Sequence, residues 1–477
     1  MGKDTLYMIL AQAFSIVAAA AVHVGMGRIL GPEPYGEFGV IMSLLAVLEV
    51  FLARGIRDSV TKYTAEFPER SAAIQKQALA IGAVFGGIVF LLYILLARPI
   101  ALAFHNANLT RPLLISALIV PFIAIYSVFI GHLSGKREFG KRAVAMNAQS
   151  LGKVAGVYIL ALMGFGLQGA VSGYVISYGL ALAVAYAYSR ERGQRASAFP
   201  ASDLISFAIP VVIFSILLSL LMNLDIFFVR GLLKDAEAAG FYTSALALTR
   251  APYFVFYAFA ITLLPIISRL TSSDRFDEAS RYVNKSLRYL LILLVPLALF
   301  TSSLAGPIIR LVYSARYLPA ARPLAILIFG ITFLTFFSVL VAVINGSGRP
   351  KTSMVLACAV LPLDLLLNLI LVPRLGLSGA AAATTISSLV GMVAAALVVQ
   401  REFGTLMKAA SFLRILLSSL VFVAVPRLLP VGGWGLIPYG IGLFFVYSLL
   451  LLRLREITPD DLSLFRNLWL GLLKRNP

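Results

Sequence analysis

The chain has 477 residues, of which 60% are hydrophobic and only 13% are charged, and its formal net charge is +19. A soluble protein carries about 25% charged residues, so this composition excludes an ordinary water-soluble domain and indicates a membrane protein. One cysteine, Cys358, and three widely spaced histidines exclude an internal disulfide and predict no metal site. No catalytic motif is recognised, and we do not expect an enzyme.

The first predicted span, residues 6–27, leads into the segment GRILGPEPYGEFGV at 27–40. Its apolar run is longer than the core of a signal peptide, so we expect it to be retained. Gly31, Pro32 and Pro34 are expected to end the first helix, and Gly36 is expected to begin the second.

Fourteen apolar stretches are long enough to cross the ~30 Å hydrocarbon core as helices. The sequence lacks the alternating pattern of a membrane barrel, which predicts an all-α polytopic membrane protein. The predicted spans are 6–27, 38–57, 78–97, 112–132, 143–163, 167–189, 204–224, 239–264, 288–305, 321–344, 352–373, 377–400, 411–426 and 433–452.

The basic residues are distributed unevenly between the loops. With the N-terminus inside, 28 of the 40 Lys and Arg fall in inner segments and ten in outer segments, Arg230 among the latter. This bias predicts a multi-pass protein of the cell (cytoplasmic or inner) membrane with both termini cytoplasmic. The inner loops face anionic lipid headgroups, so no nucleic-acid partner is needed to explain them.

Short sequences recur at nearly constant spacing along the chain. GEF at 36–38 matches GFY at 240–242, SGK at 134–136 matches SGR at 347–349, and GLQGA at 166–170 matches GLSGA at 376–380. This order predicts two parallel six-span lobes, 1–200 and 201–402. Two further spans occupy 403–455, and residues 456–477 are predicted to form a cytoplasmic amphipathic tail. The alternative is that small-residue turns recur in any polytopic protein.

The segment RILGPEPYGEFG, followed by FLARGIRDSVTKYTAE, resembles the multidrug/oligosaccharidyl-lipid/polysaccharide exporter superfamily. The similarity is strongest to its polysaccharide-transport branch, the Wzx-type flippases, and the turn pattern LGPxxYGxF carries most of it. The resemblance implies a V-shaped, MATE-like fold of two six-helix lobes plus two extra C-terminal helices. It also implies flipping of polyprenyl-diphosphate-linked sugars from the cytoplasmic to the outer leaflet.

Two cations are predicted to lie within spans, where a charge usually faces a cavity or a partner. Arg250 lies near the membrane midplane, about ten residues into its span, and Lys153 lies in the middle of the fifth span. A guanidinium offers a fork of donors to phosphate oxygens, so Arg250 is a candidate for binding a diphosphate, with a structural pair inside the helix bundle as the alternative. Lys153 is a candidate for extending this cationic lining of the diphosphate site. Arg54 and Arg57, at the inner end of the second span, suit a vestibule for an anionic headgroup or ordinary positive-inside anchoring, with Asp58 as a local partner of Arg54.

Three acidic residues are candidates for gating or ion coupling. Glu49 maps one helical turn from Arg250 in the repeat, so the two are candidates for a switchable pair. Asp364 is predicted to carry a cation or a proton, or to be structural. Asp225, at the outer end of the seventh span, is expected to be interfacial or ion-coupling.

Together these features predict a flippase that moves polyprenyl-diphosphate-linked oligosaccharide by alternating access for cell-surface polysaccharide biosynthesis. The alternatives are a cation-coupled multidrug exporter of the same fold and a lipid II-type flippase. No cofactor is expected, and no ATP-binding motif is found, so coupling to protons, sodium or the membrane potential is expected. The expected partners are membrane lipids, the lipid-linked oligosaccharide and polysaccharide polymerase machinery.

Overall fold

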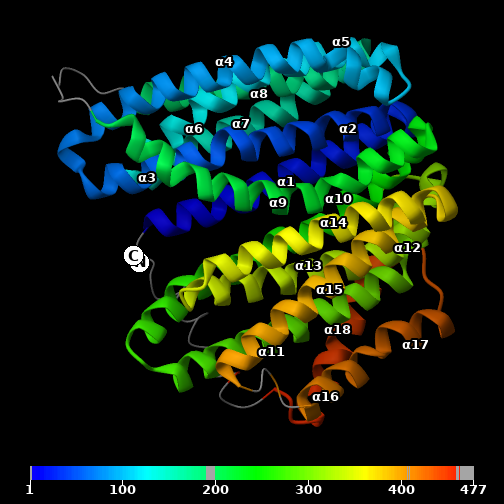
Figure 1. Ribbon diagram of the computed structural model, residues 1–477. Coiled ribbons are helices and arrows are strands. Elements are labelled where there is room, and N and C mark those ends of the chain that lie inside the picture. The colour runs from blue at the N-terminus through cyan, green and yellow to red at the C-terminus, as the bar shows by residue number, and fades with distance from the viewer. Residues whose placement is uncertain (1–2, 190–198, 405–406, 408, 458–460, 462–477) are drawn as a thin grey trace. The chain divides into compact units, whose positions relative to one another are not determined.

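The computed structural model describes residues 3–189, 199–404, 407, 409–457 and 461 (Figure 1). Every regular element among these residues is a helix, as predicted. The chain divides into two compact units, the first comprising Met1–Ala251, Tyr313–Pro323 and Ala357–Ser387, and the second comprising Pro252–Val312, Leu324–Leu356 and Ser388–Pro477. These units follow packing rather than sequence similarity, so the lobes 1–200 and 201–402 stay a prediction.

The first unit contains the following complete helices: α1 Lys3–Leu30, α2 Pro32–Glu49, η1 Val50–Arg54, α3 Gly55–Glu66, η2 Pro68–Arg70, α4 Ser71–Ala103, η3 Ala107–Leu109, α5 Thr110–Ala117, α6 Ile119–Gly135, α7 Phe139–Leu160, η4 Ala161–Phe165, α8 Gly166–Ser189, α9 Ala201–Leu233 and η5 Ala315–Ala320. The second unit contains α11 Phe276–Ser303, α12 Ala305–Val312, α16 Ala409–Ser419, α17 Val421–Leu428, η6 Gly433–Gly435 and α18 Leu436–Arg453. Four helices contribute to both units: α10 Ala236–Ser272, α13 Ala321–Gly346, α14 Pro350–Leu375 and α15 Leu377–Phe403.

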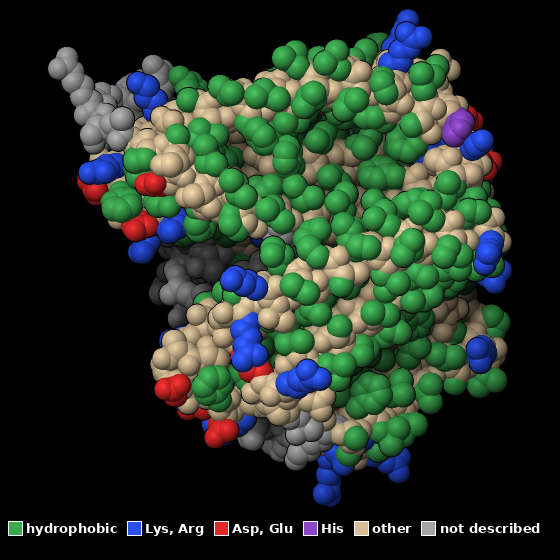
Figure 2. All heavy atoms as spheres, in the orientation of Figure 1, with side chains coloured by type: hydrophobic (Ala, Val, Ile, Leu, Met, Phe, Trp, Pro, Cys, Tyr) green, Lys and Arg blue, Asp and Glu red, His purple; other side chains and the backbone are tan. Residues whose placement is uncertain are grey.

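All fourteen predicted spans coincide with helices. Twelve stretches of the described chain are long and apolar enough to cross a membrane. One of them, Phe139–Ser189, contains two predicted spans, and the predicted span 239–264 lies in α10. On the face shown in Figure 2, hydrophobic side chains cover the sides of the helices and charged ones gather toward the helix ends. An exposed apolar flank is the surface that lipid requires.

The segment that opens the repeat folds differently from the prediction in one respect. The second helix begins at Pro32 rather than near Gly36, and Gly31 turns the chain with a φ of 78°. Proline is well suited to the first helical position because its missing N–H would have no partner there. From Pro32 the chain is helical to Glu66, with a π-helix, η1, between α2 and α3.

Matched glycines support the predicted repeat. The turns at Gly166 and Gly376 both have positive φ, 52° and 59°, which favours glycine. A Cβ added at Gly169 would lie 2.7 Å from the carbonyl oxygen of Leu160, and one added at Gly379 would lie 2.1 Å from that of Leu371. The same close helix contact therefore occurs after both turns.

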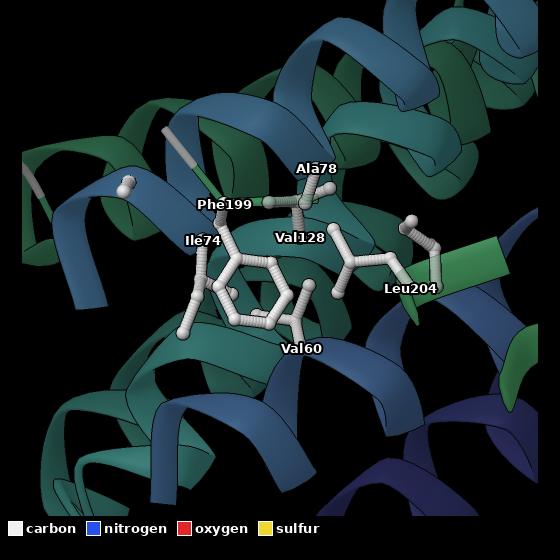
Figure 3. Close-up of a cluster of buried hydrophobic side chains, with 8 residues drawn as sticks. Val60, Ile74, Ala78, Val128, Phe199 and Leu204 are labelled. Carbon is white, nitrogen blue, oxygen red and sulfur yellow. The ribbon is translucent and has the colours of Figure 1, made fainter. Parts of the chain in front are cut away.

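Inside the first unit, α4, α6, α7 and α8 lie side by side (Figure 1). A hydrophobic cluster joins α3, α4 and α6 to the start of α9, where Phe199 and Leu204 pack against Val60, Ile74 and Val128 (Figure 3). A hydrogen bond from Ser59 Oγ to the Leu204 carbonyl oxygen, 2.9 Å long, reinforces this contact.

In the second unit, α16, α17 and α18 pack on α11. Phe422 and Tyr447 are the large residues of this cluster, and the Tyr447 hydroxyl donates to the Ile292 carbonyl oxygen at 2.9 Å. The predicted amphipathic tail lies almost wholly outside the described residues. Within it, Glu456 and Asp461 are both buried and both pair with Arg288 of α11.

The helices α2 and α10 meet through the two glycines that the repeat predicted to correspond. A Cβ added at Gly36 would lie 2.1 Å from the carbonyl oxygen of Ala236, and one added at Gly240 would lie 1.8 Å from that of Pro32. No side chain fits between these backbones.

We therefore expect Gly240→Ala to destabilise the protein by about 1–3 kcal/mol, because backbone has to move to make room. Thermal denaturation of the purified protein in detergent checks this. The matched control is Gly231→Ala on α9, where nothing lies within 4 Å of an added Cβ. Equal melting temperatures for the two variants would contradict the prediction.

Candidate functional site

The first unit buries a cluster of carboxylates and hydroxyls between α9, α10 and α15. Asp225 is 1% exposed. Its Oδ2 accepts hydrogen bonds from Tyr242 at 2.7 Å and Thr384 at 3.4 Å, and its Oδ1 accepts from the Ile226 amide at 2.9 Å. Asp225 does not end its helix, because α9 continues to Leu233, and neighbouring helices cover its side chain. Its expected interfacial depth stays a prediction.

Asp364 of α14 contacts the same face of α15. Its Oδ1 accepts from Ser387 Oγ at 2.7 Å, and its Oδ2 accepts from Asn368 Nδ2 at 3.2 Å. Ser387 is three residues after Thr384, the partner of Asp225, so the structure brings these two predicted residues together. Asn368 Oδ1 is buried and has no hydrogen-bond partner. Two buried carboxylates and an unpaired amide oxygen form an environment that favours a small cation or a proton.

Arg250 lies beside this cluster. Its Nη2 donates to Asn223 Oδ1 at 3.2 Å and to the carbonyl oxygen of Met222, both on α9. Its Nε is buried without a hydrogen-bond partner. The guanidinium is thus held by neutral acceptors and keeps a donor for another group.

Lys153 and Glu49 contact consecutive turns of α8. The Lys153 ammonium lies over the ring of Tyr174, 5.1 Å from its centroid. The Tyr178 hydroxyl donates to Glu49 Oε2 at 3.1 Å. Glu49 and Arg250 have different partners here, so the structure does not show the pair that the repeat suggested.

Arg54 and Arg57 share one carboxylate, as the sequence indicated for Arg54. Asp58 lies 3.4 Å from Arg54 Nε and 3.5 Å from Arg57 Nε. All three side chains are between 30% and 41% exposed, so these pairs are weak and leave both arginines available to an anion.

One buried ion pair was not predicted from the sequence. Arg230 Nη2 lies 2.8 Å from Glu37 Oε1, and their side chains are 3% and 5% exposed. Asn106 Nδ2 also donates to Glu37 Oε1, at 3.1 Å. Arg230, counted with the outer segments in the sequence, lies within α9, which continues to Leu233. An acid within the most family-specific segment, LGPEPYGEFG, was the signal that could have pointed to Glu37.

The helices of this unit and the charges buried among them define a multi-pass membrane protein of transporter type. Comparison with known proteins gives the family. The family model described as "Polysaccharide biosynthesis protein" matches residues 1–271, and the model described as "MatE" matches residues 210–370. The chain belongs to the polysaccharide biosynthesis protein family, within the multidrug/oligosaccharidyl-lipid/polysaccharide exporter superfamily.

Similar proteins are found in bacteria and archaea. The chain is 21% identical to the lipid II flippase MurJ of Bacillus subtilis, over 88% of this chain and 84% of that protein. It is 21% identical to the putative O-antigen transporter of Shigella flexneri, over 80% of this chain and 93% of that protein. A shorter match, 36% identical, to an uncharacterized membrane protein of Methanocaldococcus jannaschii covers 28% of this chain and 26% of that protein.

Solved structures share the fold. A lipid II flippase MurJ in an inward closed conformation has a TM-score of 0.77 and 17% identity, covering 96% of this chain and all of that one. An inward-facing multidrug resistance MATE family transporter of the MOP superfamily has a TM-score of 0.68 and 14% identity, covering 84% of this chain and 96% of that one. At this identity the likeness is one of fold, and it confirms the predicted fold class.

The Glu37–Arg230 pair gives a stability prediction. We expect Arg230→Met to cost about 3–5 kcal/mol, because it leaves a buried carboxylate without its counter-charge. Thermal denaturation in detergent checks the loss, and the double variant Glu37→Leu/Arg230→Met is expected to recover most of it. Arg316→Met is the control, because Arg316 pairs with Glu237 at the surface, where the side chains are 65% and 43% exposed. Equal effects of Arg230→Met and Arg316→Met would refute the prediction.

Proposed function

We propose that this protein flips a polyprenyl-diphosphate-linked oligosaccharide from the cytoplasmic to the outer leaflet by alternating access, for cell-surface polysaccharide biosynthesis. Membership of the polysaccharide biosynthesis protein family supports this proposal. So do relatives that are named as a lipid II flippase and a putative O-antigen transporter. The proposal includes an inner-membrane location with both termini cytoplasmic, and delivery of the product to polysaccharide polymerases.

The observation that carries the proposal is a pair of cations within the spans that make no direct ion pair among the described residues, although Asp225 acts on Arg250 and Glu49 acts on Lys153 at longer range. In the part of the chain that the structure describes, neither Arg250 nor Lys153 forms an ion pair with a carboxylate. Charges at this depth are expensive and usually serve a ligand or a pathway. A diphosphate is a fitting ligand, because charge-assisted hydrogen bonds to its oxygens would offset the cost of taking both groups out of water.

Arg250, Lys153, Arg54 and Arg57 are the proposed diphosphate-binding residues, and Glu49 is the proposed gating residue. The sugars and the diphosphate would follow this polar path while the polyprenyl chain stays in lipid. Such a path avoids exposing unpaired polar groups to hydrocarbon.

We propose that Asp225 and Asp364 carry the coupling ion, a proton or sodium. Both are buried, and their protein ligands are hydroxyl, amide and backbone N–H groups rather than cations. Asp225 of α9 and Asp364 of α14 contact the same face of α15, and two such carboxylates repel each other unless a proton or a cation neutralises one of them. Arg250 lies beside them, but its hydrogen bonds go to Asn223 and Met222. Occupancy of this cluster would then favour one of two conformations of the surrounding helices.

The first experiment measures flipping in proteoliposomes that contain a polyprenyl-diphosphate oligosaccharide. We expect Arg250→Ala to slow flipping roughly ten- to a hundredfold, because a charge-assisted hydrogen bond is worth about 1.5–3 kcal/mol. Arg310→Ala, at an exposed arginine of α12, is the matched control and should flip at the wild-type rate.

The alternatives give different outcomes in the same vesicles. If the wild-type protein moves no lipid-linked glycan but exports a cationic dye down an ion gradient, it is a multidrug exporter. If it moves lipid II alone among several donors, its substrate class is narrower than proposed.

The ion-coupling proposal has its own test. We expect Asp364→Asn and Asp225→Asn to abolish the acceleration of flipping by an imposed proton or sodium gradient, because a neutral amide cannot exchange a proton or bind a cation as tightly. Flipping rates are compared with and without each gradient. Asp277→Asn, at an exposed position in the first turn of α11, is the control. Full stimulation in both cluster variants would exclude this role.

A further inference from the structure

A second group of cations lies near the junction of α3, α6 and α7, and only Arg54 and Arg57 of this group were predicted from the sequence to bind an anion. Arg142, in the first turn of α7, is half-buried. Its Nη1 donates to Ser134 Oγ at 3.0 Å. Its Nε is buried and has no hydrogen-bond partner. Arg142 therefore has a fixed guanidinium with an unused donor.

The groups that act electrostatically on Arg142 are Arg57, Asp58 and Tyr126. Asp58 already pairs with both Arg54 and Arg57. Arg142 forms no ion pair with it, and the other acid near this group, Glu49, accepts a hydrogen bond from Tyr178. Three guanidiniums therefore face two carboxylates, and the group keeps a net positive charge. Arginines placed this close repel one another unless an anion lies between them.

Tyr126 supplies a second unused donor. Its hydroxyl is buried without a hydrogen-bond partner, and its neighbours include Arg57, Arg142 and Glu49. Its ring packs edge-on against Tyr178, the partner of Glu49, with 6.4 Å between centroids. A buried hydroxyl without a partner costs free energy, and an incoming oxygen acceptor would remove that cost.

The helix α6 holds these groups in place. Tyr126 and Ser134 both belong to α6. A Cβ added at Gly131 of α6 would lie 2.6 Å from the carbonyl oxygen of Arg57, and Thr61 Oγ1 donates to both of these backbones, at 2.8 and 3.1 Å. The donors are therefore positioned by close backbone packing, as a binding site requires.

We propose that Arg57, Arg142 and Tyr126 form a binding site for a phosphoryl anion, the inner phosphoryl site, which receives the diphosphate of the lipid-linked substrate. This assignment rests on the proposed flippase function. A diphosphate carries two or more negative charges and several acceptor oxygens, which match the excess of guanidiniums and the unused donors. Arg142 and Glu49 both act electrostatically on Tyr126, and Glu49 also acts on Lys153, so the site is electrostatically linked to the cation Lys153.

The test measures binding to the full-length protein in nanodiscs of phosphatidylcholine, with geranyl diphosphate as the probe. We expect Arg142→Gln to weaken binding about tenfold or more and Tyr126→Phe to weaken it a few-fold, because each removes donors to the phosphoryl oxygens. Arg142→Lys keeps the positive charge but loses the planar set of guanidinium N–H donors, so we expect an intermediate loss of affinity for geranyl diphosphate. The controls are Lys141→Gln, which removes an exposed charge next to Arg142, and Tyr188→Phe, which removes an exposed hydroxyl.

Unchanged affinity for geranyl diphosphate in both Arg142→Gln and Tyr126→Phe would overturn the proposal. A second arm measures retention of phosphatidylglycerol by each variant. Loss of that lipid without loss of geranyl diphosphate would assign the site to a lipid headgroup phosphate, which also overturns the substrate assignment.

Flipping by the same variants separates this inference from the proposed function. Slower flipping in Arg142→Gln and Tyr126→Phe, with normal flipping in the two controls, supports both. If the wild-type protein flips no glycan donor but geranyl diphosphate binding still depends on Arg142, the phosphoryl site stands and the flippase proposal fails.

Discussion

The structure depends on one constraint, which is that lipid offers no hydrogen bonds and no counter-charges. Backbone groups are satisfied within helices, so every regular element among the described residues is helical. Side-chain charges need partners from other helices. Glu37 therefore meets Arg230 from a helix 193 residues away, and Asp225 is surrounded by donors from α10 and α15.

The sequence was sufficient to predict features that depend on local signals. All fourteen stretches chosen by apolar length coincide with helices, and the matched glycine segments both form turns with positive φ, at Gly166 and Gly376. Prediction from the sequence failed where the burial of a side chain depends on helices that are distant in the chain. The segment 225–233 carries Asp225 and Arg230 and looks like the end of a span, but α2, α10 and α15 supply the polar partners that allow the helix to continue. No local pattern in the sequence points to Arg142 or Tyr126 as binding residues. They come near Arg57 only because α3 and α7 pack on α6.

The two predicted halves of the repeat differ in chemistry at one pair of positions that the sequence matches. Tyr242 hydrogen-bonds Asp225 in the second half, and Phe38 is its counterpart in the first. Phe38 packs edge-to-face against His23 and Tyr174. At this pair of positions, Tyr242 donates a hydrogen bond to a carboxylate, whereas Phe38 makes ring contacts. Positions that match in sequence therefore differ in their contacts.

The π-helix Val50–Arg54 alters how this part of the chain is compared with other proteins. A π-turn holds one residue more than an α-turn, so the helix that follows is rotated by about 100° relative to an unbroken α-helix. A helical wheel drawn through residues 32–66 therefore assigns Arg54 and Arg57 to the wrong side relative to Glu49. A homologue with a continuous α-helix here would be one residue shorter. An alignment that keeps the arginines in register has to place a gap within the π-turn, even where an ungapped alignment gives more identities.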